Sequence, residues 1–210
     1  MILRDLLFRY PTLSRVDEPI WSGYEVLRNT VRDKGTILSC GNGGSSADAE
    51  HIVGELAKGF RLRRPLDEGT ASKLHDLTSS TGERVTDYLQ GAIRAIPLAS
   101  SGPLASAIGN DLGFEYVFAQ QVLAYGNPGD SLIGITTSGN SPNIALAASL
   151  AIRLGLHVVG LTGRSGGRLS DIASVCIRVP EDETFAIQEL HLPVYHALCS
   201  MLEADMFTAG

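Results

Sequence analysis

Four side chains in two separate stretches of the sequence could transfer protons or bind a metal ion. His51 and Glu55 are four residues apart, so they share one face if the stretch after Ser45 is a helix. Gln188 and His196 are eight residues apart, within about 80° of each other around an ideal helix. Two imidazoles, a carboxylate and an amide oxygen could hold zinc or another divalent metal, or supply a general acid and base. The spacing alone equally fits half-buried polar side chains without a chemical role.

Two stretches rich in glycine and hydroxyl side chains precede predicted helices. GNGGSS follows a predicted strand that ends at Cys40, and TTSGNSPN follows a predicted strand that ends at Thr136. The carboxyl ends of parallel strands bind ligands in open α/β sheets, and the amino termini of helices stabilise anions. Ser45 and Ser141 could instead be simple helix caps. Two similar loops on one sheet favour a phosphate site, and the absence of the GxGxxG and Walker patterns indicates a small phosphorylated molecule.

Short apolar runs alternate with helical patterns along the chain, which predicts a parallel sheet covered on both faces by helices. The predicted strands are Thr36–Cys40, Ala95–Ala99, Ser131–Thr136, His157–Thr162 and Ser174–Val179. The predicted helices are Ile2–Tyr10, Trp21–Asp33, Ser45–Phe60, Leu104–Gly109, Phe114–Ala124, Asn143–Leu154 and Thr184–Met206. We therefore expect a three-layer α/β/α sandwich with a five-stranded parallel sheet and right-handed crossovers.

The segment 61–94 interrupts this alternation of strands and helices. It is charged, and its apolar residues follow a helical rather than a strand pattern. We expect a helical insertion against one edge of a single domain that spans residues 1–210, because no low-complexity linker divides the chain.

The composition is that of an ordinary globular protein, with 44% hydrophobic and 19% charged residues. A net charge of −6 argues against nucleic-acid partners, since phosphate backbones bind basic surfaces. No apolar run approaches the roughly 20 residues of a membrane-spanning helix, and MILRDLLFRYPTL is a poor signal peptide. Cys40, Cys176 and Cys199 are an odd number in apolar surroundings, which is typical of buried, reduced thiols. We expect a cytoplasmic protein without membrane partners.

Five motifs in the chain resemble those of one known family. They are CGNGGSSADAEHIVGEL, IGND, PGDSLIGITTSGNSPN, LTGRSGG and IQELHLPVYHAL, and they cover nearly the whole chain except the insertion. In this order they are similar to the phosphoheptose isomerases of the SIS-domain superfamily. The loop motifs are specific only to sugar-phosphate binding, whereas the H-x-x-x-E and Q-x7-H pairs are more particular to the isomerases.

The resemblance implies an SIS fold and a homotetramer with active sites lined by more than one subunit. It also implies conversion of sedoheptulose 7-phosphate, a ketose, into glycero-manno-heptose 7-phosphate, an aldose, through an enediol. The implied substrate-binding and phosphate-binding residues are Asn42, Gly43, Ser45, Thr136, Thr137, Ser138, Ser141 and Gln188. The implied catalytic and metal constellation, which binds zinc in several relatives, is His51, Glu55, Gln188 and His196. We take Glu55 as the base and His196 as the partner acid.

The chain departs from the family pattern at two places. Ser100 and Ser101 stand where enzymes of lipopolysaccharide heptose synthesis tend to have an aspartate. AKGFR replaces the usual TGRYR, so Gly59 stands where the family has an arginine, and Lys58 or Arg61 could substitute for it. These differences leave the stereochemistry of the product and the pathway open.

Two other functions fit parts of the same pattern. One is isomerisation of a different sugar phosphate, for instance in secondary-metabolite heptose synthesis. The other is a non-catalytic SIS regulator or scaffold, such as the tetrameric DnaA-binding initiation factor. Such a protein would keep the phosphate loops and lose the four-residue constellation. This chain retains all four residues of the constellation.

Overall fold

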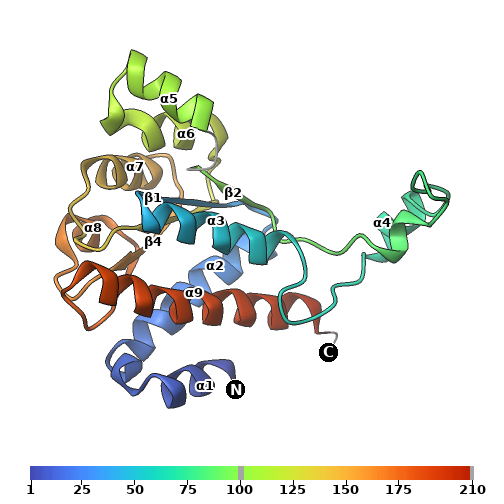
Figure 1. The fold of residues 1–210 in the computed structure, drawn as a ribbon, viewed down its shortest axis with the longest axis horizontal. Coiled ribbons are helices and arrows are strands. Elements are labelled where there is room, and N and C mark those ends of the chain that lie inside the picture. The colour runs from blue at the N-terminus through green and yellow to red at the C-terminus, as the bar shows by residue number, and fades with distance from the viewer. Residues whose placement is uncertain (99–101, 209–210) are drawn as a thin grey trace.

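A five-stranded parallel sheet forms the centre of the protein (Figure 1). The computed structural model describes residues 1–98 and 102–208. The strands are β1 (Ile37–Gly41), β2 (Ala95–Pro97), β3 (Ser131–Ile135), β4 (His157–Thr162) and β5 (Val175–Arg178). They lie in the order β2-β1-β3-β4-β5, so β1 and β3 are neighbours and their carboxyl ends meet at one edge. The predicted sheet is confirmed.

Helices cover both faces of this sheet, as the sequence predicted. The helices are α1 (Ile2–Arg9), α2 (Asp17–Arg32), α3 (Gly44–Ala57), α4 (Glu68–Lys73), α5 (Gly102–Asp111), α6 (Val117–Tyr125), α7 (Pro142–Arg153), α8 (Gly167–Ile172) and α9 (Thr184–Phe207). The described residues also form the short 3-10 helices η1 (Pro11–Val16), η2 (Val85–Asp87) and η3 (Phe114–Tyr116). The short α8 and η1 have no counterpart among the predicted elements.

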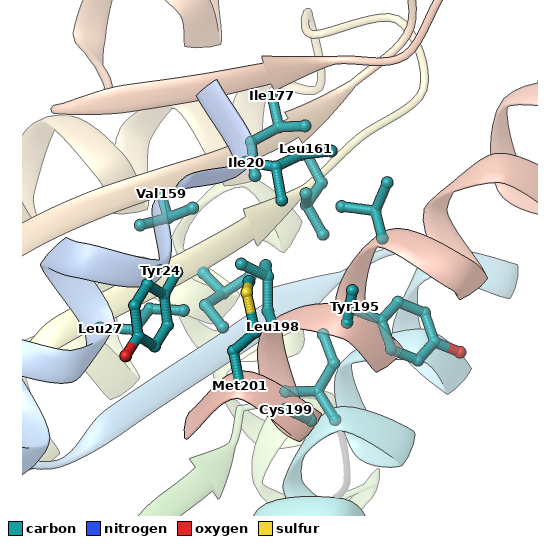
Figure 2. Packing of buried hydrophobic residues seen from close by; sticks show 14 of the residues in the cluster. Ile20, Tyr24, Leu27, Val159, Leu161, Ile177, Tyr195, Leu198, Cys199 and Met201 are labelled. Atoms are coloured by element: carbon teal, nitrogen blue, oxygen red, sulfur yellow. The ribbon is translucent and has the colours of Figure 1, made fainter. Parts of the chain in front are cut away.

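Two apolar cores lie on opposite faces of the sheet, because successive side chains of a strand point to opposite sides. On β1, Ile37 belongs to the core that includes buried residues of α1, α2, α3 and α9, whereas Leu38 belongs to the core that includes buried residues of α5, α6, α7 and α8. Figure 2 shows part of the first core, in which Leu198 and Met201 of α9 pack near Leu27 of α2. Burial on both faces is the reason that the strands have nearly continuous apolar sequences.

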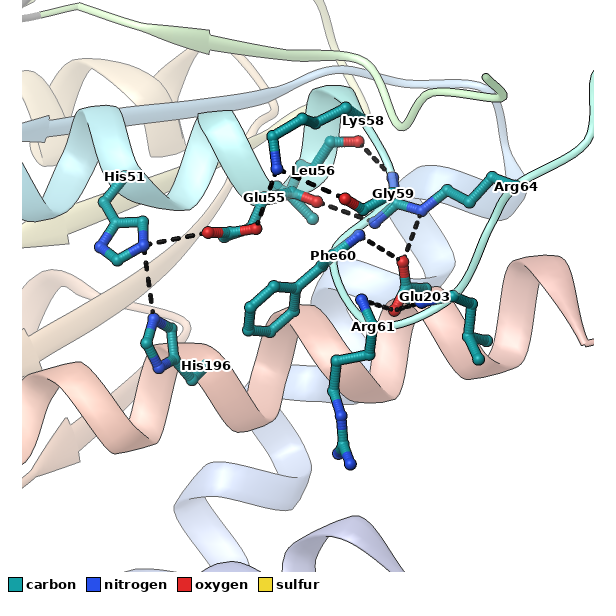
Figure 3. Close-up of polar contacts among 11 residues, drawn as sticks. His51, Glu55, Leu56, Lys58, Gly59, Phe60, Arg61, Arg64, His196 and Glu203 are labelled. Carbon is teal, nitrogen blue, oxygen red and sulfur yellow. Dashed lines mark hydrogen bonds and ion pairs between the residues drawn. The ribbon is translucent and has the colours of Figure 1, made fainter. Parts of the chain in front are cut away.

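Helices α3 and α9 lie side by side in the first of these layers (Figure 1). In α3, Ala49, Ile52 and Leu56 are buried in the core. This apolar stripe at helical spacing fixes the rotation of α3 about its axis. His51 and Glu55 therefore lie on the flank of α3 that faces α9 (Figure 3).

The insertion differs from the predicted helical segment. Within 61–94 only α4 and η2 are helical, and a bridge between Thr78 and Arg84 closes a small turn. The part that carries α4 extends away from the body instead of lying against its edge (Figure 1). No residue of α4 is buried, so no apolar face stabilises a longer helix there.

Two of the three cysteines are buried, as predicted, and the third is half-buried. Burial raises the pKa of Cys40 and of Cys199 to about 12, so both thiols remain protonated and unreactive. All three cysteines are free of disulfides. None of the described helices is long and apolar enough to cross a membrane.

Candidate active site

The two glycine-rich loops meet where β1 and β3 end. Each loop leads into a helix, α3 after Gly43 and α7 after Ser141, and neither of these N-cap residues caps its helix through a side chain. The N–H groups of Ser45 and Ser46 donate to the carbonyls of Asn42 and Gly43, and the N–H of Ile144 donates to Oδ1 of Asn143. It is therefore chiefly the dipoles of the two helices that favour an anion at this place. Gly43 has a φ of +56°, a conformation that side chains other than glycine rarely adopt.

Side-chain hydrogen bonds join the two loops and shape the space between them. Asn42 and Asn143 exchange two amide hydrogen bonds of 2.9 Å each. The Thr136 and Ser141 hydroxyl oxygens are 2.9 Å apart. Ser141 thus bonds its neighbour in the loop instead of capping α7, which weakens the interpretation of this residue as a simple cap. The contact between Asn42 and Asn143 thus joins the two loops, whereas that between Thr136 and Ser141 lies within the second loop.

The other predicted phosphate ligands differ in how far they are exposed. Ser45 is buried in the first turn of α3, and Thr137 is half-buried. Ser138 is exposed, and its hydroxyl accepts a hydrogen bond of 3.1 Å from the Asn140 N–H. The structure therefore brings the predicted phosphate-binding residues to one edge of the sheet, with Ser138 the most accessible hydroxyl.

Gln188 lies at the end of the site formed by the glycine-rich loops. Its side chain covers Gly44, where an added Cβ atom would be only 2.7 Å from Nε2 of Gln188. Gln188 makes no hydrogen bond with His51, Glu55 or His196 in the described parts of the chain, although we grouped it with them from the sequence. Eight residues of helix separate it from His196, which is about 12 Å of rise along α9.

His51, Glu55 and His196 form one cluster between α3 and α9 (Figure 3). Nε2 of His51 is 3.0 Å from Oε1 of Glu55 and 3.5 Å from Nε2 of His196. The His51 side chain is 41% exposed and that of Glu55 is 14% exposed, so a ligand from solvent can reach them. The phenyl ring of Phe60 packs against His196 with ring centres 5.3 Å apart. The structure thus brings together three of the four predicted catalytic and metal-binding residues.

Tyr195 and Asp48 hold His51 from behind. The Tyr195 hydroxyl donates a hydrogen bond of 3.1 Å to Oδ1 of Asp48, and it lies 3.0 Å from Nδ1 of His51. Since the hydroxyl proton is used on Asp48, the oxygen accepts the proton of His51 Nδ1. A neutral His51 therefore presents the lone pair of Nε2 toward the Glu55 carboxylate, an arrangement that a proton or a metal ion between them would stabilise.

Burial changes the pKa of Asp48, Tyr195 and His196, which lie in or beside the hydrogen-bond relay Asp48–Tyr195–His51. It raises the pKa of Asp48, although the hydrogen bond from Tyr195 opposes the change. Burial and the nearby Asp48 raise the pKa of Tyr195, so the phenol keeps its proton. The pKa of His196 is lowered, first by burial and then by the charge of His51. His196 is therefore neutral near pH 7 and can accept or donate a proton.

The donor types in the cluster suit a metal ion, but the described residues do not form a complete metal site. No group of three or more His, Cys, Asp or Glu side chains within residues 1–98 and 102–208 is arranged to hold a metal. The cluster still has two imidazoles and a carboxylate, and Oε2 of Glu55 is buried without a hydrogen-bond partner. Imidazole and carboxylate ligands are those that zinc prefers at catalytic sites.

The structure explains why Gly59 replaces the arginine of the family. A Cβ atom on Gly59 would be 2.3 Å from Oε1 of Gln90 and 2.5 Å from the carbonyl oxygen of Leu62, so no side chain fits. Lys58 is close to the site instead, with Nζ 3.6 Å from Oε2 of Glu55. The other departure, at Ser100 and Ser101, lies outside the described residues.

Four residues of the site were not singled out from the sequence. Asp48 lies one helical turn before His51, and Tyr195 directly precedes His196, so helical spacing could have identified them. Arg64 and Glu203 meet across 139 residues of sequence, and no local pattern predicts such a pair.

The sheet order and the two hydroxyl-rich loops at adjacent helix amino termini define a protein of the SIS-domain class. A sequence profile described as SIS domain matches residues 11–104 and 91–163. The chain is 38% identical over 182 residues to a phosphoheptose isomerase from Akkermansia muciniphila. The aligned residues cover 87% of this chain and 82% of that protein.

Two solved structures extend this similarity to three dimensions. Phosphoheptose isomerase GmhA from Neisseria gonorrhoeae has a TM-score of 0.75 and 32% identity over 96% of this chain and 94% of its own. A phosphoheptose isomerase from Francisella tularensis has a TM-score of 0.75 and 31% identity over 92% of this chain and 90% of its own. The chain belongs to the phosphoheptose isomerase family.

Proposed function

We propose that this protein isomerises sedoheptulose 7-phosphate to glycero-manno-heptose 7-phosphate. The observation that supports this most directly is the distance between the phosphate loops and the His51–Glu55–His196 cluster. Seven residues of α3 separate Gly44 from His51, a rise of about 10 Å. An extended seven-carbon sugar phosphate is of comparable length, so its phosphate can bind the loops while C1 and C2 lie at the cluster.

The residues at the cluster suit a proton transfer between C1 and C2. Glu55 takes a proton from C1 of the ketose, and the electrons form the C1–C2 double bond of an enediolate. His196 donates a proton to the C2 oxygen as the enediol forms. Glu55 then returns its proton to C2, and His196 takes the proton of the C1 hydroxyl, whose oxygen becomes that of the aldehyde. The phosphate loops contribute by holding the substrate in one orientation.

We infer that zinc or another divalent metal binds at the cluster when present. His51, Glu55 and His196 would hold it, with Tyr195 and Asp48 orienting His51 through its other ring nitrogen. A bound metal would polarise the substrate carbonyl as a Lewis acid. The assignment of Gln188 as a further metal ligand is retained as a proposal that metal analysis of a Gln188→Ala variant can test.

We also propose that the protein is a homotetramer, as the family resemblance implies. Leu6 of α1 is buried within the subunit, but Phe8 is 87% exposed and Trp21 is 45% exposed. Large exposed apolar side chains of this kind favour contact with another subunit. Light scattering at micromolar concentration tests the assembly, and a monomer would contradict it.

Incubation with sedoheptulose 7-phosphate, followed by NMR of the product, tests the reaction and its stereochemistry. Glu55→Gln keeps the shape of the side chain but removes the proton acceptor, so turnover should fall by about 10²–10⁴-fold. Glu50→Gln changes an exposed carboxylate of the same helix and should leave turnover unchanged. Tight binding of the sugar phosphate without any product would support the regulator or scaffold instead, and full activity of Glu55→Gln would refute the base.

A further inference from the structure

Arg64 is a fully buried arginine at the carboxyl end of the helix that carries Glu55. Its guanidinium donates hydrogen bonds of 2.8 Å to the carbonyl of Glu55 and 2.7 Å to the carbonyl of Leu56. These carbonyls belong to the last turn of α3, where backbone acceptors lack partners within the helix. The positive charge is also favourable at this end of the helix dipole. Arg64 thus fixes the position of the turn from which Glu55 projects.

Glu203 of α9 completes this contact from the other helix (Figure 3). Its Oε1 accepts hydrogen bonds of 2.8 Å from Nε of Arg64 and from the N–H of Phe60. Its Oε2 accepts hydrogen bonds of 2.8 Å from the N–H of Arg61 and 3.2 Å from the N–H of Leu62. The carboxylate is 1% exposed, and four donors satisfy it.

The electrostatic environment keeps Glu203 ionised. Burial by itself would raise the pKa of Glu203, but the N–H groups of Phe60 and Arg61 and the charge of Arg64 lower it below its usual value. Removal of either partner would leave the other charge buried and unpaired.

The pair also shapes the wall beside His196. Glu203 follows His196 by seven residues, two turns of α9, so both side chains lie on nearly the same face of that helix. The backbone that Glu203 holds carries Phe60, whose ring packs on His196, and Arg61. Phe60, Arg61 and His196 line a cavity of about 450 Å³. One ion pair therefore connects the turn of Glu55, the wall of this cavity and the helix of His196.

The insertion is attached at the same place. The N–H of Arg64 donates to Oε1 of Gln90 at 3.3 Å, and the N–H of Gly91 donates to the carbonyl of Arg64 at 2.9 Å. The two ends of the segment that extends from the body are thus closed by the backbone of Arg64.

We propose that Arg64 and Glu203 are positioning residues for the isomerisation, which set the distance between Glu55 on α3 and His196 on α9. This proposal rests on the proposed role of Glu55 as the base. A misplacement of about 1 Å can lower a rate by about 10²-fold without loss of the residues that react. An ion pair that served only stability would change the melting temperature and leave turnover of the folded enzyme unchanged.

Steady-state kinetics with sedoheptulose 7-phosphate test the proposal on Glu203→Gln, Arg64→Met and Arg64→Lys. For folded Glu203→Gln and Arg64→Met we expect kcat to fall by about 10²-fold, with KM changed far less because the phosphate loops are intact. Arg64→Lys keeps the charge but cannot form the same fork of hydrogen bonds, so it should recover only part of kcat. Binding of inorganic phosphate should be unchanged in all three variants.

Asp205→Asn is the matched control. Asp205 is on the same helix as Glu203 and forms an exposed two-bond pair with Arg32, at 2.9 and 3.1 Å, so its loss should not affect kcat. If Arg64→Met does not fold, Glu203→Gln decides, because it preserves the size and shape of the side chain. Wild-type kcat in folded Glu203→Gln, together with an inactive Glu55→Gln, would overturn the positioning role alone. An active Glu55→Gln would instead refute the proposed base.

Discussion

Tyr195→Phe removes a single oxygen atom that connects Asp48 to His51. Tyr195 is 1% exposed, and Figure 2 shows its ring at the side of the apolar core with the hydroxyl pointing away from it. Phenylalanine keeps this ring packing, so the change opens no cavity within the core. The perturbation is therefore limited to two hydrogen bonds, one to the Asp48 carboxylate and one from Nδ1 of His51.

The expected cost follows from what these groups lose. A hydrogen bond to a charged group contributes about 1.5–3 kcal/mol, so the free energy of unfolding should fall by roughly that amount. Asp48 suffers most, since its Oδ2 is already buried without a partner. His51 loses the acceptor that fixes its tautomer and ring orientation. If His51 binds a metal as proposed, such a loss typically lowers metal affinity or activity by about 10–100-fold.

The assay combines three measurements on the same preparation. These are kcat and KM with sedoheptulose 7-phosphate, bound zinc by elemental analysis, and thermal unfolding. Tyr24→Phe is the control, because Tyr24 is a buried tyrosine of the same core that packs against Trp21 instead of the site. Tyr195→Phe should lose activity and zinc, and Tyr24→Phe neither. Wild-type kcat and zinc content in Tyr195→Phe would refute the role assigned to this relay.

Two further changes test other parts of the structure. Gly44→Ala places a methyl group 2.7 Å from Nε2 of Gln188, so this amide must move. The free energy of unfolding should change by less than about 1 kcal/mol, since alanine suits a helix. We expect kcat/KM to fall, and unchanged kinetics would exclude a role for Gln188. His191 is fully buried, and burial lowers its pKa from 6.5 to about 4. Between these pH values the unfolded chain binds more protons than the folded protein does, so acid lowers the free energy of unfolding by up to about 3 kcal/mol. His191→Phe should make this loss smaller, which urea titrations at pH 7 and pH 4.5 measure.

The sequence alone determined the layered sheet and the position of the two glycine-rich loops. Continuous apolar strands separated by helical patterns have few arrangements other than a parallel sheet covered on both faces. The loops after Cys40 and Thr136 could be placed at one edge because parallel strands end on the same side. The His51–Glu55 pair could also be predicted from the sequence, since residues four apart on a helix share a face.

Only the tertiary structure decided how the two helices of the site meet. His196 joins His51 and Glu55, whereas Gln188 of the same helix lies at Gly44, because the axial position of α9 along α3 depends on packing that no local pattern encodes. For the same reason, the sequence does not predict that Arg64 and Glu203 form an ion pair. In the insertion, by contrast, a local pattern was present but did not decide the structure. Its apolar residues follow a helical pattern, but no residue of α4 is buried against the body, so only a short helix forms.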